Sequence, residues 1–489
     1  MLLTFWATAA TVIGLLLFSA EMIQDAMNAT SHALASPLAN RTYRHLYLAQ
    51  ISALTGTGVM TVGLALLAYQ LAGDDAGAVL GIALSLRIVA FVLISPLFGA
   101  YAHLLPRRRV LVALDLLRAA TVLVLPFVDA VWQVYALIFV INAASAGFTP
   151  LFQATIPEVL PDEAVYTRAL SLSRLAYDLQ QLLAPALAGV LLWFLPLDAL
   201  FAVNGAAFLI SAALVLSVML PGARKVTRPE GVLANIGWGT RLYLTTPRLR
   251  GLLALSMAVA AATAMVIVNT VVYVRDVLGG GDTLVTVAYA ASGGGSMLAA
   301  LLLPRVLDRI AERTLMLAGG AVMAGGMAAG MLMPSLGGLL AIWFLIGVGS
   351  SLVQTPGGRL LRRSSDEEDR PALFAAQFAL SHACWLVTYL VAGVVGNEIG
   401  LFWTFGLLSL IVVASSGLAM RLWPSLDPEV LEHEHASLHH QHLHVHDEHH
   451  RHEHEGWEGP EPHRHPHRHA PQRHRHRYVI DMHHQQWPA

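Results

Sequence analysis

Long apolar stretches and short polar connections alternate along most of the chain. A bilayer core about 30 Å thick requires about 20 apolar residues per helix, so stretches of that length predict membrane spans. Twelve such stretches are bounded by charges, Pro or Gly: 46–71, 79–102, 110–128, 131–153, 167–192, 198–220, 251–274, 283–303, 314–333, 337–355, 372–395 and 400–422. The pattern therefore predicts an all-α polytopic membrane protein.

The connections between the predicted spans sort by charge. Basic residues gather after spans two, six, eight and ten, whereas the opposite connections carry mostly Asp and Glu. The basic set is Arg107, Arg108, Arg109, Arg224, Lys225, Arg228, Arg241, Arg248, Arg305, Arg309, Arg313, Arg359, Arg362, Arg363 and Arg370. Because Lys and Arg favour the cytoplasmic side, we predict a multi-pass protein of the cytoplasmic membrane with both ends of the bundle and the C-terminal tail in the cytoplasm.

The longest polar break in this body, Pro221 to Arg250, separates six spans from six. A weak repeat supports two halves, because the pattern from Gly99 to Arg109 has a counterpart from Pro304 to Arg313, about 205 residues later. The predicted units are an accessory apolar segment at 1–40, six-helix halves at 41–220 and 251–423, a cytoplasmic central loop at 221–250, and a disordered histidine-rich tail at 424–489.

Composition narrows the classes of function. Hydrophobic residues make up 56% of the chain and charged residues 13%, against about 25% charged in soluble domains. The one cysteine, Cys384, excludes a disulfide framework and a thiolate-cluster metal site. The sequence has no G-x-x-x-x-G-K-S/T motif for ATP and no nucleic-acid footprint. We expect a monomeric membrane protein that is not an enzyme and has no resident cofactor.

Nineteen of the 23 histidines lie in the tail, between His433 and His484. Neutral imidazole is the commonest side-chain metal ligand, so this clustering predicts binding of a transition metal. The candidate ligands are His433, His435, His439, His440, His442, His444, His446, His449, His450, His452, His454, His463, His465, His467 and His469. The alternative is a solvated low-complexity tail without a ligand, because nothing in the pattern fixes a geometry that selects one metal.

Ionisable side chains at membrane depth are costly unless they are paired or hydrated, so each is a candidate for function. Asp178 lies about 16 Å into its span, and Arg174 precedes it by four residues on the same helical face. The repeat offset carries Asp178 to His382 or Ala383, so we predict a site for a divalent ion between Asp178 and His382. The predicted transport pathway is Asp178, Arg174, Gln181, His382 and Cys384.

Simpler interpretations remain open for each of these residues. Arg174 and Asp178 can neutralise each other as a packing device, and a lone membrane histidine is often only a hydrogen-bond partner between helices. Asp115 and Arg118 are three residues apart, which suits either a cytoplasmic gate or a structural pair. Arg87 is isolated in span two, where we expect it to pair with Asp115 or Asp178.

The loop after span two resembles the marker of the major facilitator superfamily, which reads G-x-x-x-D-R-x-G-R-R. Gly99 and the run Arg107 to Arg109 match this marker, whereas His103, Leu104 and Pro106 stand in place of its Asp, Arg and Gly. The resemblance covers about Arg41 to Trp423 and implies a twelve-span bundle of two six-helix halves. The gating residues that it implies, together with the shallow pair of span three, are Asp115, Arg118, Arg107, Arg108, Asp308 and Arg309.

Together with the histidine tail and the stretches 148–157 and 168–178, the chain looks like the bacterial nickel-resistance exporters of that superfamily. This resemblance implies metal resistance through efflux of Ni²⁺ or Co²⁺ by a proton antiporter, with the metal as substrate and tail ligand. One alternative is efflux of an organic solute, siderophore or drug, with the tail as a metal sensor. Another is a metal-binding receptor or storage protein anchored by the bundle.

Overall fold

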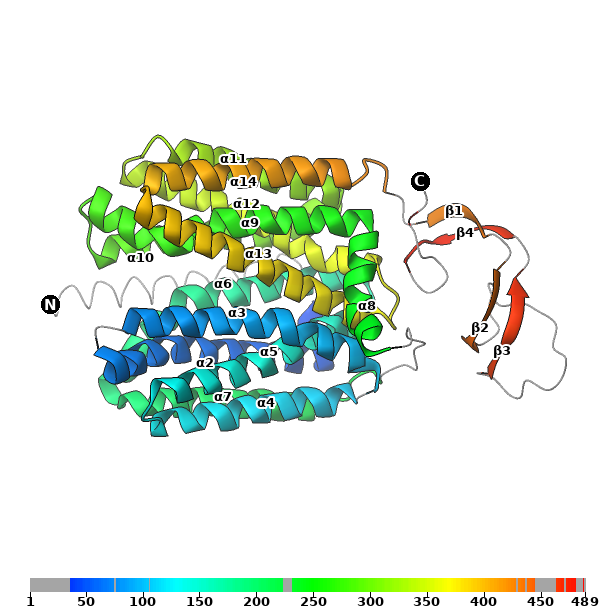
Figure 1. The fold of residues 1–489 in the computed structure, drawn as a ribbon, viewed down its shortest axis with the longest axis horizontal. Helices are drawn as coiled ribbons and strands as arrows, with labels where there is room; N and C mark the ends of the chain where they lie inside the picture. The colour runs from blue at the N-terminus through cyan, green and yellow to red at the C-terminus, as the bar shows by residue number, and fades with distance from the viewer. Residues whose placement is uncertain are drawn as a thin grey trace.

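The structure is a computed structural model. It describes residues 36–73, 76–104, 106–222, 231–427, 430–435, 438–444, 463–469, 472–480 and 487. Nearly all of the predicted accessory segment at 1–40 lies outside these residues. Figure 1 shows a long helical bundle, with four strands beyond one of its ends.

Six helices form one layer of the bundle, drawn from blue to teal in Figure 1. They are α2 (Arg41–Ala72), α3 (Ala76–Tyr101), α4 (Arg107–Val124), α5 (Val131–Val159), α6 (Glu163–Phe194) and α7 (Leu197–Leu216), with 3₁₀ turns at Pro37–Ala39, Ala102–Leu104 and Leu125–Phe127. The Asn40 side chain accepts a hydrogen bond from the Tyr43 N–H and so caps α2, as Asp162 caps α6 through the Val165 N–H. Three of the buried apolar clusters consist only of residues from this group, which we call the first half.

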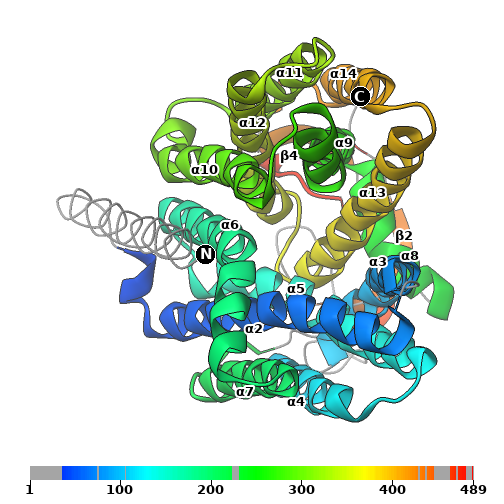
Figure 2. The same ribbon diagram turned by 90° about the vertical axis from the view of Figure 1, so that its left-hand side faces the viewer.

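A second group of six helices lies against the first, as Figure 2 shows end-on. They are α9 (Pro247–Val272), α10 (Asp282–Leu307), α11 (Glu312–Gly330), α12 (Leu336–Arg363), α13 (Arg370–Glu398) and α14 (Leu401–Leu422), with a π-helical turn at Tyr273–Val277 after α9. Trp343 and Phe405 are fully buried in a cluster that α9 dominates. We call this group the second half.

One further helix, α8 (Val232–Thr245), occupies the segment that we predicted as a loop. Trp238 and Leu242 are one turn apart and both buried, so the segment has an apolar face that a helix can pack. The Trp238 Nε1–H donates to Asp369 at 2.9 Å, and the Tyr243 hydroxyl donates to Gln377 of α13. Burial raises the pKa of Tyr243 well above its usual value, so this hydroxyl stays a donor. The helix therefore braces one end of the bundle against α13.

Helices cover all twelve predicted spans, but fewer than twelve are apolar enough to count as spans by composition. In the described part of the chain, ten helices pass a test of length and hydropathy, and α6 makes an eleventh if its two parts, bent by 48° between Ala184 and Ala186, form one span. Only α11 falls short, because its 19 residues begin with Glu312 and Arg313 and are rich in Gly and Ala.

The glycines of the second half allow close helix packing. A Cβ added to Gly347 of α12 would overlap the carbonyl oxygen of Ser292 in α10, and one added to Gly295 of α10 would overlap that of Phe344 in α12. On α11, a Cβ at Gly319 would come within 2.7 Å of the Gly349 carbonyl oxygen. Small residues bring these backbones together, which is how membrane helices associate without a hydrophobic driving force.

The tail contains strands where we predicted disorder. Strands β1 (Val430–His435) and β4 (Gln472–Arg477) form one antiparallel ladder, and β2 (Leu438–His444) and β3 (His463–His469) form another. The register places Glu432 opposite Arg475 and Glu434 opposite Arg473.

We predict that Gly347→Ala destabilises the purified protein, because the new methyl group overlaps the α10 backbone and such overpacking costs about 1–3 kcal/mol. Gly417→Ala is the matched control, since a Cβ there meets nothing within 4 Å. Thermal unfolding in detergent should show a lower Tm for Gly347→Ala only. Equal Tm values for the two variants would contradict the described packing of α10 on α12.

Candidate functional site

Buried arginines gather at the end of the bundle where α4 and α11 begin and α5 and α12 end. We call this the basic end. In the first half, Arg107 of α4 forms a 2.6 Å ion pair with Glu158 of α5, and both side chains are less than a tenth exposed. Glu158 also lies 3.8 Å from the guanidinium of Arg370, the first residue of α13. One carboxylate therefore links α4 and α5 to the second half.

The second half repeats this pair with the charges exchanged. Glu312 at the start of α11 lies 3.3 Å from Arg363 at the end of α12, and 51 residues separate them, as 51 residues separate Arg107 from Glu158. The two pairs are offset by about 205 residues, which is the offset of the sequence repeat. A second arginine of α12, Arg359, lies 3.1 Å from Glu312. The repeat thus conserves the position of the ion pair and inverts its sign.

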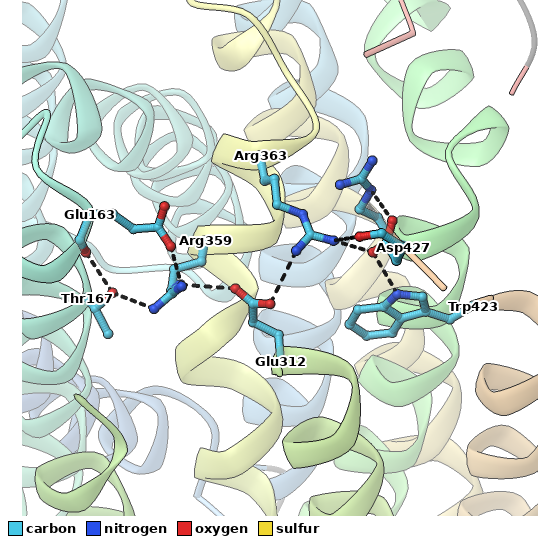
Figure 3. A network of polar contacts seen from close by, with 8 residues as sticks. Glu163, Thr167, Glu312, Arg359, Arg363, Trp423 and Asp427 are labelled. Atoms are coloured by element: carbon cyan, nitrogen blue, oxygen red, sulfur yellow. Dashed lines mark hydrogen bonds and ion pairs between the residues drawn. The ribbon is translucent and has the colours of Figure 1, made fainter. Parts of the chain in front are cut away.

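Figure 3 shows how this network crosses between the halves. Arg359 pairs with Glu163, the first residue of α6, and donates to the Thr167 hydroxyl at 3.1 Å. Arg362 donates to the Pro161 carbonyl just before α6. Between the halves, the first half therefore supplies carboxylates and the second half supplies arginines. These contacts close the bundle at the basic end.

A further contact between the halves lies deeper in the bundle. Arg174 and Asp178 form the ion pair that their spacing predicted, with Nη2 3.0 Å from Oδ1 and Nε 3.2 Å from Oδ2. The Arg174 Nε–H also donates to the Ser296 hydroxyl of α10 at 3.0 Å. Asp178 lies about 20 Å along α6 from the basic end, at membrane depth. The pair therefore joins the halves, which the sequence did not indicate.

The structure does not bring His382 to Asp178. His382 Nδ1 lies 2.7 Å from the Phe378 carbonyl oxygen, and the imidazole packs on Phe378 and Phe91 with centroids 4.2 and 4.8 Å away. The partners of Asp178 are Arg174 and Ser296. Across the residues that the structure describes, no group of three His, Cys, Asp or Glu side chains could hold a metal ion. The repeat offset fixed the depth of His382 but not its direction around α13.

Arg87 of α3 has other neighbours than we predicted. We expected it to pair with Asp115 or Asp178, yet its guanidinium lies 5.4 Å from the centre of the Phe91 ring. It is close enough to His382 and Tyr389 to interact with them electrostatically, and its side chain is exposed. Within the described ranges it forms no ion pair with a carboxylate. Aromatic side chains of α3 and α13 therefore lie beside an arginine without a carboxylate partner in the described residues.

The two remaining residues of the predicted transport pathway differ in their exposure. Cys384 is buried on α13, whereas Gln181 is exposed. Its neighbour Gln180 instead packs toward Gly58 of α2, where its amide nitrogen would lie 2.7 Å from an added Cβ. Among the described contacts, the Gln181 side chain has no hydrogen bond, and the Cys384 carbonyl accepts one from the Thr388 hydroxyl at 3.1 Å.

The predicted gating residues of the first half have mainly structural contacts. Arg118 pairs with Asp115, and its guanidinium lies between the rings of Phe148 and Phe208, 4.2 and 4.5 Å from their centroids. The Ser211 hydroxyl donates to the same carboxylate at 2.7 Å. All these partners belong to the first half, which favours the structural pair over the gate. Arg108 likewise ties α4 to α7 through the Leu216 carbonyl at 2.6 Å.

Asp308 and Arg309 are exposed after α10 and form no ion pair in the described part of the chain. Glu312, four residues after Asp308 in the same loop pattern, holds Arg359 and Arg363 instead. Sequence reasoning missed Glu158, Glu163 and Glu312 as partners of the basic residues that it had noticed. Glu312 lies in an arginine-rich connection, which was a signal, whereas the connection between Glu158 and Glu163 contains no basic residue.

The tail ligands stay a prediction. His446, His449, His450, His452 and His454 lie outside the described residues. The backbone register of the strands places histidines opposite one another at four positions: His433 with His474, His440 with His467, His442 with His465, and His444 with His463.

Comparison with known proteins gives the family. The model of the Major Facilitator Superfamily matches residues 46–336 and 252–445. The multidrug efflux pump Tap of Mycobacterium tuberculosis is 25% identical over 396 residues, which cover 77% of this chain and 92% of Tap.

Solved structures share the fold. The human organic anion transporter MFSD10 aligns with a TM-score of 0.68 at 14% identity, over 78% of this chain and 99% of that one. A bacterial homologue of the iron transporter ferroportin, in an outward-facing state, aligns with a TM-score of 0.63 at 16% identity, over 78% of this chain and 97% of that one. At these identities the likeness concerns the fold alone.

The family match spans both halves of the bundle, from α2 to α14, and agrees with the charge-inverted repeat between them. It also places the chain among transport proteins and not among enzymes. The chain therefore belongs to the Major Facilitator Superfamily and is a multi-pass membrane transporter.

Proposed function

We propose that this protein is a proton-coupled exporter of an organic solute that carries an anionic group on an apolar body. Its basic end faces the cytoplasm, because the arginines concentrate there. Efflux of organic compounds is the activity named for Tap, with which this chain aligns over most of its length. The twelve packed helices and their two-half construction suit a transporter that binds its substrate between the halves.

Arg87 carries this proposal. It is an exposed cation beside the aromatic rings of Phe91 and His382, so it offers one charge next to an apolar surface. Arg174 is neutralised by Asp178, whereas Arg87 forms no ion pair with a carboxylate among the described residues. Unit charges 4 Å apart interact by about 4 kcal/mol in a partly shielded protein environment. An anionic group gains this attraction, whereas a bare divalent cation meets repulsion.

The Arg174 and Asp178 pair supplies a means of coupling. Protonation of Asp178 removes the charge that holds the Arg174 guanidinium in a two-point contact. Arg174 also binds Ser296 of the second half, so loss of the ion pair weakens a contact between the halves. Proton binding and separation of the halves are thereby linked.

A second candidate function is export of Ni²⁺ or Co²⁺, and the cross-strand histidines of the tail favour it. In that case the tail captures metal, and the pathway ligands Asp178 and His382 come together in another conformation. Under the organic-solute proposal the same histidines act as a metal sensor. The two candidates are distinguished by measuring the proton-driven uptake of fluorescein, ethidium and Ni²⁺ into everted vesicles. We expect fluorescein to accumulate, and accumulation of Ni²⁺ alone would contradict the proposal.

We predict that Arg87→Gln lowers the apparent affinity for an anionic dye by at least about tenfold, because a charge-assisted contact contributes about 1.5–3 kcal/mol. Uptake of a neutral or cationic dye should change little. Arg421→Gln is the matched control, since it removes an exposed arginine from the end of α14. The initial rate against dye concentration in everted vesicles measures the effect. Equal loss for anionic and cationic dyes would show that Arg87 serves folding instead.

For the coupling step, Asp178→Asn should abolish uphill transport driven by a pH gradient, because the amide does not release a proton. Exchange of labelled for unlabelled substrate needs no net proton movement and should persist. Asp198→Asn, at an exposed acid of the first turn of α7, is the control and should retain both activities. Gradient-driven transport that survives Asp178→Asn would remove Asp178 from the coupling mechanism.

Closure of the basic end depends on Glu312 in this account. Glu312→Gln removes one of the two carboxylate partners of each of two largely buried arginines, Arg359 and Arg363. Loss of one partner of a buried pair costs up to about 3–5 kcal/mol. We expect a transport rate at least about tenfold lower, measured in vesicles with matched protein content. Asp308→Asn, at the exposed acid four residues before, should leave the rate close to that of the parent. The opposite ranking of the two variants would restore Asp308 as the gate.

A further inference from the structure

The end of the tail returns to the bundle. Tyr478, Val479 and Ile480 are 5%, 4% and 5% exposed, and Tyr478 and Ile480 belong to the buried apolar cluster of the second half. Trp487 packs against the same cluster and meets the Tyr478 ring at 5.2 Å between centroids. Apolar residues buried at the end of a segment made mainly of His, Arg and Glu indicate a specific docking surface.

That surface lies where α9 begins and α14 ends. The Arg248 guanidinium is 4.7 Å from the centre of the Trp487 ring, and its side chain is only 1% exposed. Its Nε lies 3.5 Å from Asp427, which follows α14. A guanidinium that stacks on an indole and pairs with a carboxylate is held on both sides. The docked terminus thus covers a buried cation of the basic end.

Asp427 connects the docked terminus to the contacts between the halves. Its carboxylate also binds Arg363 and accepts from the Trp423 Nε1–H at 3.0 Å. Arg363 in turn shares Glu312 with Arg359, the residue that pairs with Glu163 of the first half. Figure 3 shows this line of contacts from Asp427 to Glu163. The tail surface and the closure of the basic end are therefore parts of one charge network.

The tail is tied at its base as well. Val430 at the start of β1 lies opposite Arg477, the residue directly before Tyr478. The chain therefore leaves the basic end after Asp427 and comes back beside its own departure point.

We propose that Tyr478, Val479, Ile480 and Trp487 form an intramolecular latch on the basic end. While docked, the latch covers Arg248, holds it against Asp427 and stabilises the closed arrangement of Arg363, Glu312 and Arg359. The halves separate at the basic end only after the latch leaves its surface. The tail then controls how often the pathway opens toward the side on which the tail lies, whatever the transported solute is.

A cysteine at Ser171 reports this opening. Ser171 is 5% exposed and lies on α6 between Thr167 and Arg174, each of which bonds to the second half. We would introduce Ser171→Cys with Cys384→Ser, which removes the native thiol. The rate of modification by a water-soluble maleimide is then measured on the purified full-length protein in detergent. In the closed arrangement the thiol is shielded, so the rate measures the fraction of open molecules.

Deletion of residues 478–489 and Trp487→Ala should each raise the modification rate on the order of fivefold or more, the usual scale of coupling between two sites. Trp132→Ala is the matched control, because Trp132 is an exposed tryptophan at the other end of the bundle, and it should leave the rate unchanged. A synthetic peptide of residues 478–489, added to the shortened protein, should lower the rate again. The same peptide carrying Trp487→Ala should not.

An unchanged rate in both the shortened protein and the Trp487→Ala variant would overturn the latch. A raised rate that the peptide fails to lower would also overturn it, since the effect would then come from loss of folding and not from an empty surface. The thermal unfolding of each variant, measured in parallel, distinguishes local opening from general destabilisation. The readout needs no transported solute, so the latch and the proposed function fail independently.

Discussion

A buried arginine needs a carboxylate, and at the basic end the first half of this transporter supplies carboxylates to arginines of the second half. Glu158 and Glu163 of the first half meet Arg370 and Arg359 of the second. Two of these four residues also pair within their own half, Glu158 with Arg107 and Arg359 with Glu312. When the halves separate, these two local pairs stay in place. Glu163 and Arg370 become exposed to water, which replaces their lost contacts at low cost. The closed end is thus stable but can open, as a transport cycle requires.

Charge pairing also explains what the interior can bind. Asp115 and Asp178 are occupied by arginines of their own helices, so neither carboxylate is free for a metal ion. Arg87 is a cation beside aromatic rings, and its positive charge is the reason for proposing an anionic substrate. The same principle extends to the tail, where Trp487 and Asp427 hold Arg248 between them. The closed basic end, the proposed substrate surface and the proposed latch each depend on an arginine.

The sequence predicted the bundle well because membrane spans follow from local composition. Helical spacing predicted the Arg174 and Asp178 pair. The prediction failed where three-dimensional direction matters. His382 lies at the depth that the repeat offset predicted, but its ring faces Phe91 and Phe378. The acids Glu158, Glu163 and Glu312 were not identified, since their partners lie on helices far away in the chain.

The account is tested most directly by a structure of the full-length protein bound to the dye that accumulates in everted vesicles. We predict the anionic group of the dye against the Arg87 guanidinium, with its apolar body on Phe91 and Phe378, between α3 and α13. The Arg174 and Asp178 pair should be altered in the same complex. A dye bound away from Arg87, or an ordered metal ion between Asp178 and His382, would contradict the account.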